Sequence, residues 1–144
     1  MTARASAASS PEEVTLSAVL FSGTDDKLTA AAVLVVGAAA MERRVDVLLQ
    51  YWALDAFRAD RITKGHGVAP EAGDGGLQLV QRHGSQHWSE LLRQAKEMGD
   101  VRIHACSLSM EMLDITKDEL DPLVDDVEGV ASFFATAGGG VTFI

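Results

Sequence analysis

The chain has little cysteine: Cys106 is the only one among 144 residues. A single cysteine cannot form a disulfide within its own chain, and the absence of C-x-x-C excludes a thioredoxin-type dithiol. The composition therefore suits a reducing compartment. If Cys106 acts beyond packing, it acts as a thiolate, that is, as a nucleophile, a sulfur carrier, a redox sensor or a metal ligand.

Basic residues and long apolar runs are also scarce. The chain has 12 Lys and Arg against 21 Asp and Glu, a net charge of −9, which argues against a nucleic-acid binder and against docking on an anionic membrane. The longest strongly apolar stretch, residues 28–41, is too short to span a bilayer. Residues 1–13 lack an apolar core of signal-peptide length. We expect a cytoplasmic protein with no membrane or nucleic-acid partner, in which residues 1–13 are a disordered lead-in and residues 14–144 form one domain.

Strand-like apolar runs alternate with helical patterns along the chain. The expected strands are residues 14–21, 45–51, 101–106, 127–130 and 141–144, and the expected helices are residues 24–41, 52–59, 88–98 and 131–137. This alternation implies parallel crossovers with helices on both faces of a sheet. The sequence therefore predicts a three-layer α/β/α fold with a mostly parallel sheet of about five strands.

Two segments of the sequence, residues 24–41 and 60–84, suggest further structural features. Helix 24–41 is apolar on nearly all sides, so we expect it to contact a neighbouring subunit as well as its own sheet. Thr24 and the acids after it fit the start of this helix. Residues 60–84 are rich in glycine, and a loop of this length in a compact domain is typical of a functional or mobile segment.

Ligands of an open parallel sheet bind beyond the carboxyl ends of the strands. This rule brings together residues that follow three different strands: Ser22, Gly23, Trp52, Cys106, Ser107, Ser109 and Met110. We expect them to share one edge of the sheet and to form, together with His104, a pocket for an anion or a substrate, with Trp52 and Met110 shielding Cys106 from water.

The chemistry of Cys106 depends on its ionisation, because a free thiol has a pKa of about 8.5. If residues 107–112 form a helix, its free N–H groups point back at the sulfur and favour the thiolate. His104 lies on the same strand face with its Cβ about 7 Å away. It is either a hydrogen-bonded core histidine or a cation that acts on Cys106 through water. A buried, inert Cys106 is the alternative to a reactive one.

The other site motifs considered are absent from the sequence or incomplete in it. The turn after the first expected strand lacks both phosphate-loop signatures, and there is no G-x-S-x-G elbow. His83 and His87 are the only histidines at helical spacing, and a zinc site there lacks further ligands. We therefore expect neither a metal nor an organic cofactor.

The segment around Cys106, ACSLSMEML at residues 105–113, resembles the cysteine segment of the DsrE/DsrF-like proteins. Residues 128–137, EGVASFFATA, followed by residues 141–144, resemble the last helix and strand of that family. Residues 26–31, DKLTAA, resemble its first helix, and residues 50–54, QYWAL, the aromatic end of its second strand. The likeness covers most of residues 14–144 and is weakest between residues 60 and 84.

The resemblance implies a sulfurtransferase-like fold, usually assembled into trimers or hexamers, and a role in intracellular sulfur relay. Cys106 would then carry sulfane sulfur as a persulfide and pass it to a partner such as a TusA-like carrier or a rhodanese. Residues 60–84 would gate access to it. Two alternatives stay open: a non-catalytic oligomeric module that binds a small molecule or a partner, with a structural Cys106, and a thiol redox sensor.

Overall fold

A five-stranded parallel sheet forms the centre of the fold. The computed structural model describes residues 15–82, 86–137 and 140–144, so the expected lead-in, residues 1–13, lies outside the described residues. The strands are β1 (Thr15–Leu20), β2 (Arg44–Leu49), β3 (Val101–Cys106), β4 (Asp126–Glu128) and β5 (Val141–Phe143). They lie in the order β4-β3-β2-β1-β5, and each neighbouring pair is parallel.

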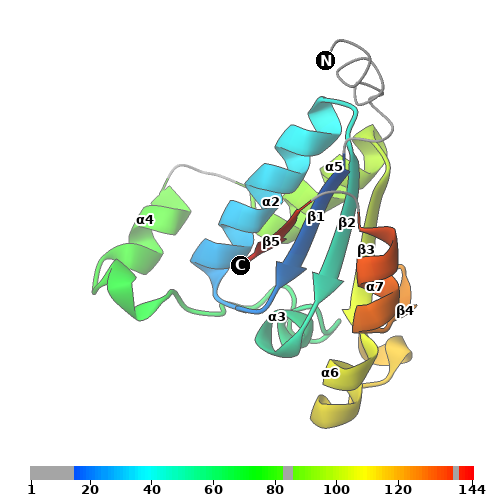
Figure 1. Cartoon of the computed structure of the whole chain (residues 1–144). Coiled ribbons are helices and arrows are strands. Elements are labelled where there is room, and N and C mark those ends of the chain that lie inside the picture. The colour runs from blue at the N-terminus through cyan, green and yellow to red at the C-terminus, as the bar shows by residue number, and fades with distance from the viewer. Residues whose placement is uncertain (1–14, 83–85, 138–139) are drawn as a thin grey trace.

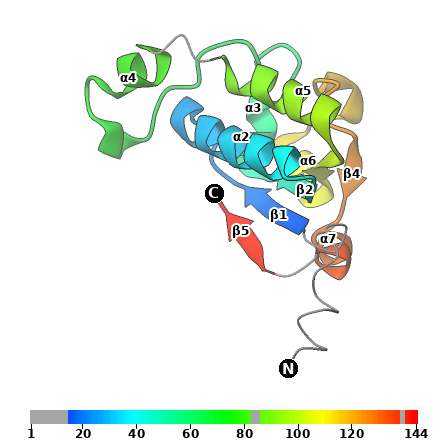
Figure 2. The ribbon, with the colours of Figure 1, turned by 90° about the horizontal axis from the view of Figure 1, so that it is seen from above.

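Helices cover both faces of this sheet, which confirms the predicted three-layer α/β/α fold. Helices α2 (Asp25–Ala40) and α5 (Trp88–Met98) pack side by side on one face, and the short α7 (Val130–Thr136) lies on the other (Figures 1 and 2). Helices α3 (Tyr51–Ala56) and α6 (Ser107–Leu113) lie at the carboxyl end of the strands (Figure 1). The expected helix 107–112 is thus present.

The two faces of the sheet differ in chemistry because successive strand residues point to opposite sides. On β2, Val45, Val47 and Leu49 belong to the large core beneath α2 and α5. The residues between them include Asp46 and Leu48, which point to the α7 side. The first face is therefore apolar, whereas the second carries buried polar groups under a thin helical cover.

Helix α2 is buried on one side, through residues such as Leu28, Ala32 and Val35. Its opposite side keeps Val33 57% and Leu34 48% exposed. Exposed apolar side chains at this spacing fit the expected contact with a neighbouring subunit, which stays a prediction. Thr24 precedes the helix, but its side chain makes no capping hydrogen bond.

The segment expected to be a long loop, residues 60–84, contains helix α4 (Gly76–Arg82) and the 3-10 turn Pro70–Ala72. Its polypeptide chain is held at the start of α2, where the Asp25 carboxylate accepts the N–H of His66 at 2.9 Å. Asp26 accepts the N–H of Ala69 at 3.2 Å. The two acids at the start of α2 therefore fix this segment, and the expectation of an irregular loop was wrong for α4.

A second 3-10 turn, Lys117–Glu119, connects α6 to β4. Within the part of the chain that the structure describes, no helix has both the length and the apolarity needed to cross a membrane.

The turn after β1 packs closely on α3 at Gly23, and a substitution there tests this packing. A Cβ at this position would overlap the backbone carbonyl of Trp52, with the carbonyl carbon 2.8 Å away. Gly23→Ala should therefore lower the free energy of unfolding by about 1–3 kcal/mol. Gly37→Ala is the matched control, because its Cβ meets nothing within 4 Å, and removing a glycine from a helix interior should stabilise by about 0.5–1 kcal/mol. Urea unfolding of both variants measures this, and equal stabilities would contradict the packing argument.

Candidate functional site

Cys106 ends the strand β3 and directly precedes α6. It is only 1% exposed and lies in a small apolar cluster with Val19, Leu48 and Phe133 on the second face of the sheet. The side chain of Gln50 approaches it, with Nε2 at 3.9 Å from Sγ. The thiol is therefore placed at the carboxyl end of a strand, as expected, but beneath α7 rather than open to solvent.

The carboxyl ends of β1, β2 and β3 do meet at one edge. The buried Ser109 hydroxyl accepts the backbone N–H of Tyr51 at 3.1 Å and so joins α6 to α3. Tyr51 has a positive φ of 45°, a backbone strain held at the point where β2 turns into α3. Ser107 is exposed and close to the following β4–α7 turn, its Oγ being 3.8 Å from a Cβ built on Gly129.

Some of the expected site residues are separate from Cys106. Ser22, Gly23 and Trp52 line a pocket of about 280 Å³ together with Arg61 and His66, and no residue of β3 or α6 lines it. Trp52 is 55% exposed, and Met110 packs in the large core on the opposite face of the sheet. The expected shielding of Cys106 by these two residues was wrong: the cover comes from Phe133, with Val130 and Ala137 at its margin.

Residues 60–84 do not cover Cys106 either. Within residues 60–82 the contacts include those with α2, an ion pair of Arg61 with Asp55 of α3, and a ring contact of His66 with Trp88, the two rings lying 5.9 Å apart. Figure 1 shows α4 on the opposite side of the molecule from α7. The helix that packs over the thiol is α7, through Phe133.

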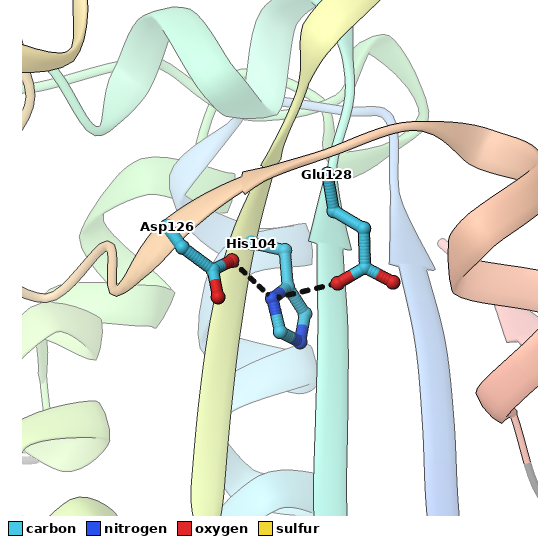
Figure 3. A group of neighbouring side chains, drawn as sticks. All are labelled: His104, Asp126 and Glu128. Atoms are coloured by element: carbon cyan, nitrogen blue, oxygen red, sulfur yellow. Dashed lines mark hydrogen bonds and ion pairs between the residues drawn. The ribbon is translucent and has the colours of Figure 1, made fainter.

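His104 is the centre of a charged cluster on the same face as Cys106. Its Nε2 lies 3.1 Å from Asp46 Oδ1, and its Nδ1 lies 2.5 Å from Asp126 Oδ1 and 3.1 Å from Glu128 Oε2. Figure 3 shows the carboxylates of Asp126 and Glu128 pointing at the same ring nitrogen. We call these four residues the His104 cluster. The interpretation of His104 as a hydrogen-bonded core histidine is confirmed.

The charge of His104 follows from these neighbours. Burial lowers the pKa of His104, but the hydrogen bonds to Asp126 and Asp46 and the negative charges of Asp126 and Glu128 outweigh it, so that the pKa is raised above its ordinary value. Both ring nitrogens face acceptors, and an imidazolium supplies a proton to each.

Sequence reasoning missed Asp46, Asp126 and Glu128. They come together because β3 lies between β2 and β4, with His104 opposite Leu48 on one side and Asp126 on the other. The Asp-x-Glu spacing of β4 places both acids on one strand face. That alternation was the available signal, but it has meaning only once the neighbour of β4 is known.

The comparisons with known proteins agree with the predicted resemblance. Residues 72–141, which include Cys106 and the whole β3–α6 segment, match the model of the DsrE/DsrF/DrsH-like family, which is the family that the sequence was predicted to resemble. The chain is 29% identical over 148 aligned positions to the uncharacterized protein YrkE of Bacillus subtilis (strain 168), covering 85% of this chain and 90% of that protein.

A solved structure shares the fold. The protein of unknown function MTH1491 from Methanobacterium thermoautotrophicum superposes with a TM-score of 0.59 at 16% identity, covering 91% of this chain and 99% of the other. At that identity the likeness concerns the fold alone.

Phe133 should control access to Cys106. Phe133→Ala removes the buried ring over the thiol, so we expect labelling of Cys106 by an aromatic disulfide reagent to accelerate at least about tenfold, the result of lowering a local opening free energy by about 1.4 kcal/mol. Stopped-flow absorbance under native conditions measures the rate.

Two variants serve as controls. Phe134→Ala changes the neighbouring, 55% exposed ring of the same helix and should leave the rate unchanged. Phe57→Ala opens the large core on the other face, so it reports the effect of global destabilisation. Equal acceleration by Phe133→Ala and Phe57→Ala would contradict a local cover.

Proposed function

We propose that this DsrE/DsrF-like chain takes part in sulfur relay and carries sulfane sulfur as a persulfide on Cys106. The observation that carries the proposal is the position of Cys106: it is the one thiol of the chain, it ends the strand β3, and it lies within the part of the chain that matches the family. The family supports sulfur relay at a general level, and the persulfide step is the specific part of the proposal.

The reaction needs no oxidant. The Cys106 thiolate attacks the outer sulfur of a donor persulfide, forms a Cys106 S–S bond and releases the donor as its thiolate. An acceptor thiolate then attacks the outer sulfur of the Cys106 persulfide, and Cys106 leaves as a thiolate. Each step exchanges one sulfur–sulfur bond for another, so atoms and electrons balance.

The surroundings of Cys106 supply two supports for a sulfur anion. The first turn of α6 begins at Ser107, and its N–H groups, which have no partner within the helix, follow the sulfur directly. The Gln50 amide lies 3.9 Å from Sγ. Both are hydrogen-bond donors, which stabilise a negatively charged sulfur better than a neutral one.

Transfer requires the thiol to become accessible. Phe133 covers Cys106 through a helix of only seven residues, α7, and the remainder of that helix is largely exposed. A short helix held mainly by one buried ring opens more readily than the core beneath α2 and α5. We infer that α7 moves away when a donor or acceptor docks.

For partners, we infer a homo-oligomer, a trimer or hexamer, in which the exposed Val33 and Leu34 of α2 are covered by another copy. We further infer a TusA-like carrier or a rhodanese as donor or acceptor. The acidic surface of the chain, with its net charge of −9, favours a partner with a basic docking face.

The burial of Cys106 favours a second candidate function, a non-catalytic binding module. In that case the thiol is structural, and the pocket beside Trp52, Arg61 and His66 receives a small molecule. The two candidates differ in whether Cys106 gains sulfur.

Intact-mass measurement tests the proposal. The protein is incubated with polysulfide, or with thiosulfate and a rhodanese, and a rise of one sulfur mass, about 32 Da, is expected on Cys106, removable by a reductant. Cys106→Ser should show no such mass because the chain has no other cysteine.

The Gln50→Leu variant, which loses the amide donor, should retain the modification to a lesser degree. Phe133→Ala provides an open form of the same thiol. Failure of Phe133→Ala to gain sulfur, when a persulfide-carrying control protein is labelled in the same tube, would exclude sulfur carriage and leave the binding module.

A further inference from the structure

The His104 cluster gathers three donor atoms of the kind that bind metals. His104 Nδ1, one oxygen of Asp126 and one of Glu128 all lie within 4.8 Å of one another. His104 is buried and Glu128 half-buried, with 7% and 16% of their side chains exposed, whereas 56% of the Asp126 side chain is exposed. The donors therefore converge on a point that is closed on the protein side and open on the solvent side.

We propose that His104, Asp126 and Glu128 bind a divalent transition-metal ion. In a tetrahedral site with metal–ligand bonds of about 2.0 Å, neighbouring ligand atoms lie about 3.3 Å apart. The Nδ1–Glu128 separation of 3.1 Å already fits that spacing. The Nδ1–Asp126 separation of 2.5 Å must widen, which an exposed side chain on an edge strand allows.

Asp46 supplies the support that a metal-binding histidine needs. Its Oδ1 accepts the opposite ring N–H of His104 at 3.1 Å, which directs the lone pair of Nδ1 toward Asp126 and Glu128. A carboxylate behind a ligating imidazole fixes the ring orientation and increases its basicity. Asp46 is buried, and its second oxygen lies 3.1 Å from Arg44 Nη2, so that this supporting carboxylate is itself held in place.

The balance of charge favours a dication. Three carboxylates of the cluster surround one imidazole, with Arg44 as the nearby cation. A divalent ion with a neutral imidazole brings these groups to a formal charge of zero. Without the ion, an imidazolium leaves one negative charge in excess.

The donor set indicates the class of ion. An imidazole nitrogen with two carboxylates suits zinc, manganese or ferrous iron, whereas magnesium and calcium prefer oxygen ligands throughout. Three protein ligands leave a position for water, which can enter beside the exposed Asp126.

The proposed metal site lies next to the start of α7, the helix that covers Cys106. β4 is an edge strand of three residues, and α7 begins two residues after Glu128. An ion shared by β3 and β4 would fix β4 and, through Gly129, the start of α7. The proposal does not rest on sulfur carriage, because Cys106 is not one of the three ligands.

Zinc titration tests the site. The chelated and desalted full chain is titrated with Zn²⁺ by calorimetry, and native mass spectrometry counts the ions. We expect one ion per chain, and a rise in Tm on the order of 5–10 °C at a hundredfold excess over Kd.

His104→Gln, Asp126→Asn and Glu128→Gln should each weaken binding at least about tenfold, and Asp46→Asn should weaken it by about tenfold through the ring orientation. Asp126→Asn is the variant least at risk of unfolding, since its side chain is mostly exposed.

Three matched variants should bind as the unchanged protein does. Cys106→Ser tests the thiol, His87→Gln tests the His83/His87 pair, and Asp118→Asn tests an exposed acid outside the cluster. The proposal is overturned if the unchanged chain binds no zinc at micromolar concentration, if Asp126→Asn and Glu128→Gln bind as tightly as it does, or if binding is lost in His87→Gln or Cys106→Ser instead.

Discussion

The second face of the sheet depends on one interaction, the contact of a buried imidazole with carboxylates from two neighbouring strands. His104 on β3 is bound by Asp46 on β2 and by Asp126 and Glu128 on β4. Buried charges are costly unless they are paired and hydrogen-bonded, so the cluster holds together only while all three strands stay in register. β4 has three residues, all of them paired with β3, and the carboxylate of Asp125 just before it accepts the N–H of Ile103. The cluster adds side-chain contacts to this backbone pairing.

That constraint extends to Cys106. β4 leads through Gly129 into α7, and α7 places Phe133 over the thiol. The Phe133 ring also meets that of His104 edge-on, with ring centroids 6.3 Å apart. The His104 cluster and the helix that covers the thiol are thus connected through Gly129 and through the contact between the two rings. The thiol and the imidazole share no hydrogen bond among those the structure shows. We therefore expect a change in the cluster to act on Cys106 through the start of α7.

Much of the fold could be predicted from the sequence because the relevant signals are local. The apolar run ending at Cys106 and the helical face of residues 88–98 are patterns within one element, and the structure reproduces both.

The neighbours of a side chain across a sheet are not local. The partners of His104 lie 58 and 22 positions away, and only the strand order places them beside it. The same holds for Phe133, whose position over Cys106 depends on the crossover that brings α7 to the second face. The resemblance to the DsrE/DsrF-like family could be recognised from the sequence because the segment around Cys106 is itself a local pattern. That segment lies within residues 72–141, which match the family model.

The two faces of the sheet differ in how firmly they are covered. The face beneath α2 and α5 is closed by two long helices and buries rings such as Trp88, which is anchored to Asp25 by a 3.0 Å hydrogen bond. The α7 face is closed by one short helix with a single fully buried ring. Local opening free energies follow the apolar area that must be exposed, so we expect α7 to separate from the sheet at a cost well below that of global unfolding. Under the proposed function, a thiol beneath such a helix would be protected from adventitious oxidation while the protein is alone, and a partner that binds α7 would release it without disturbing the main core.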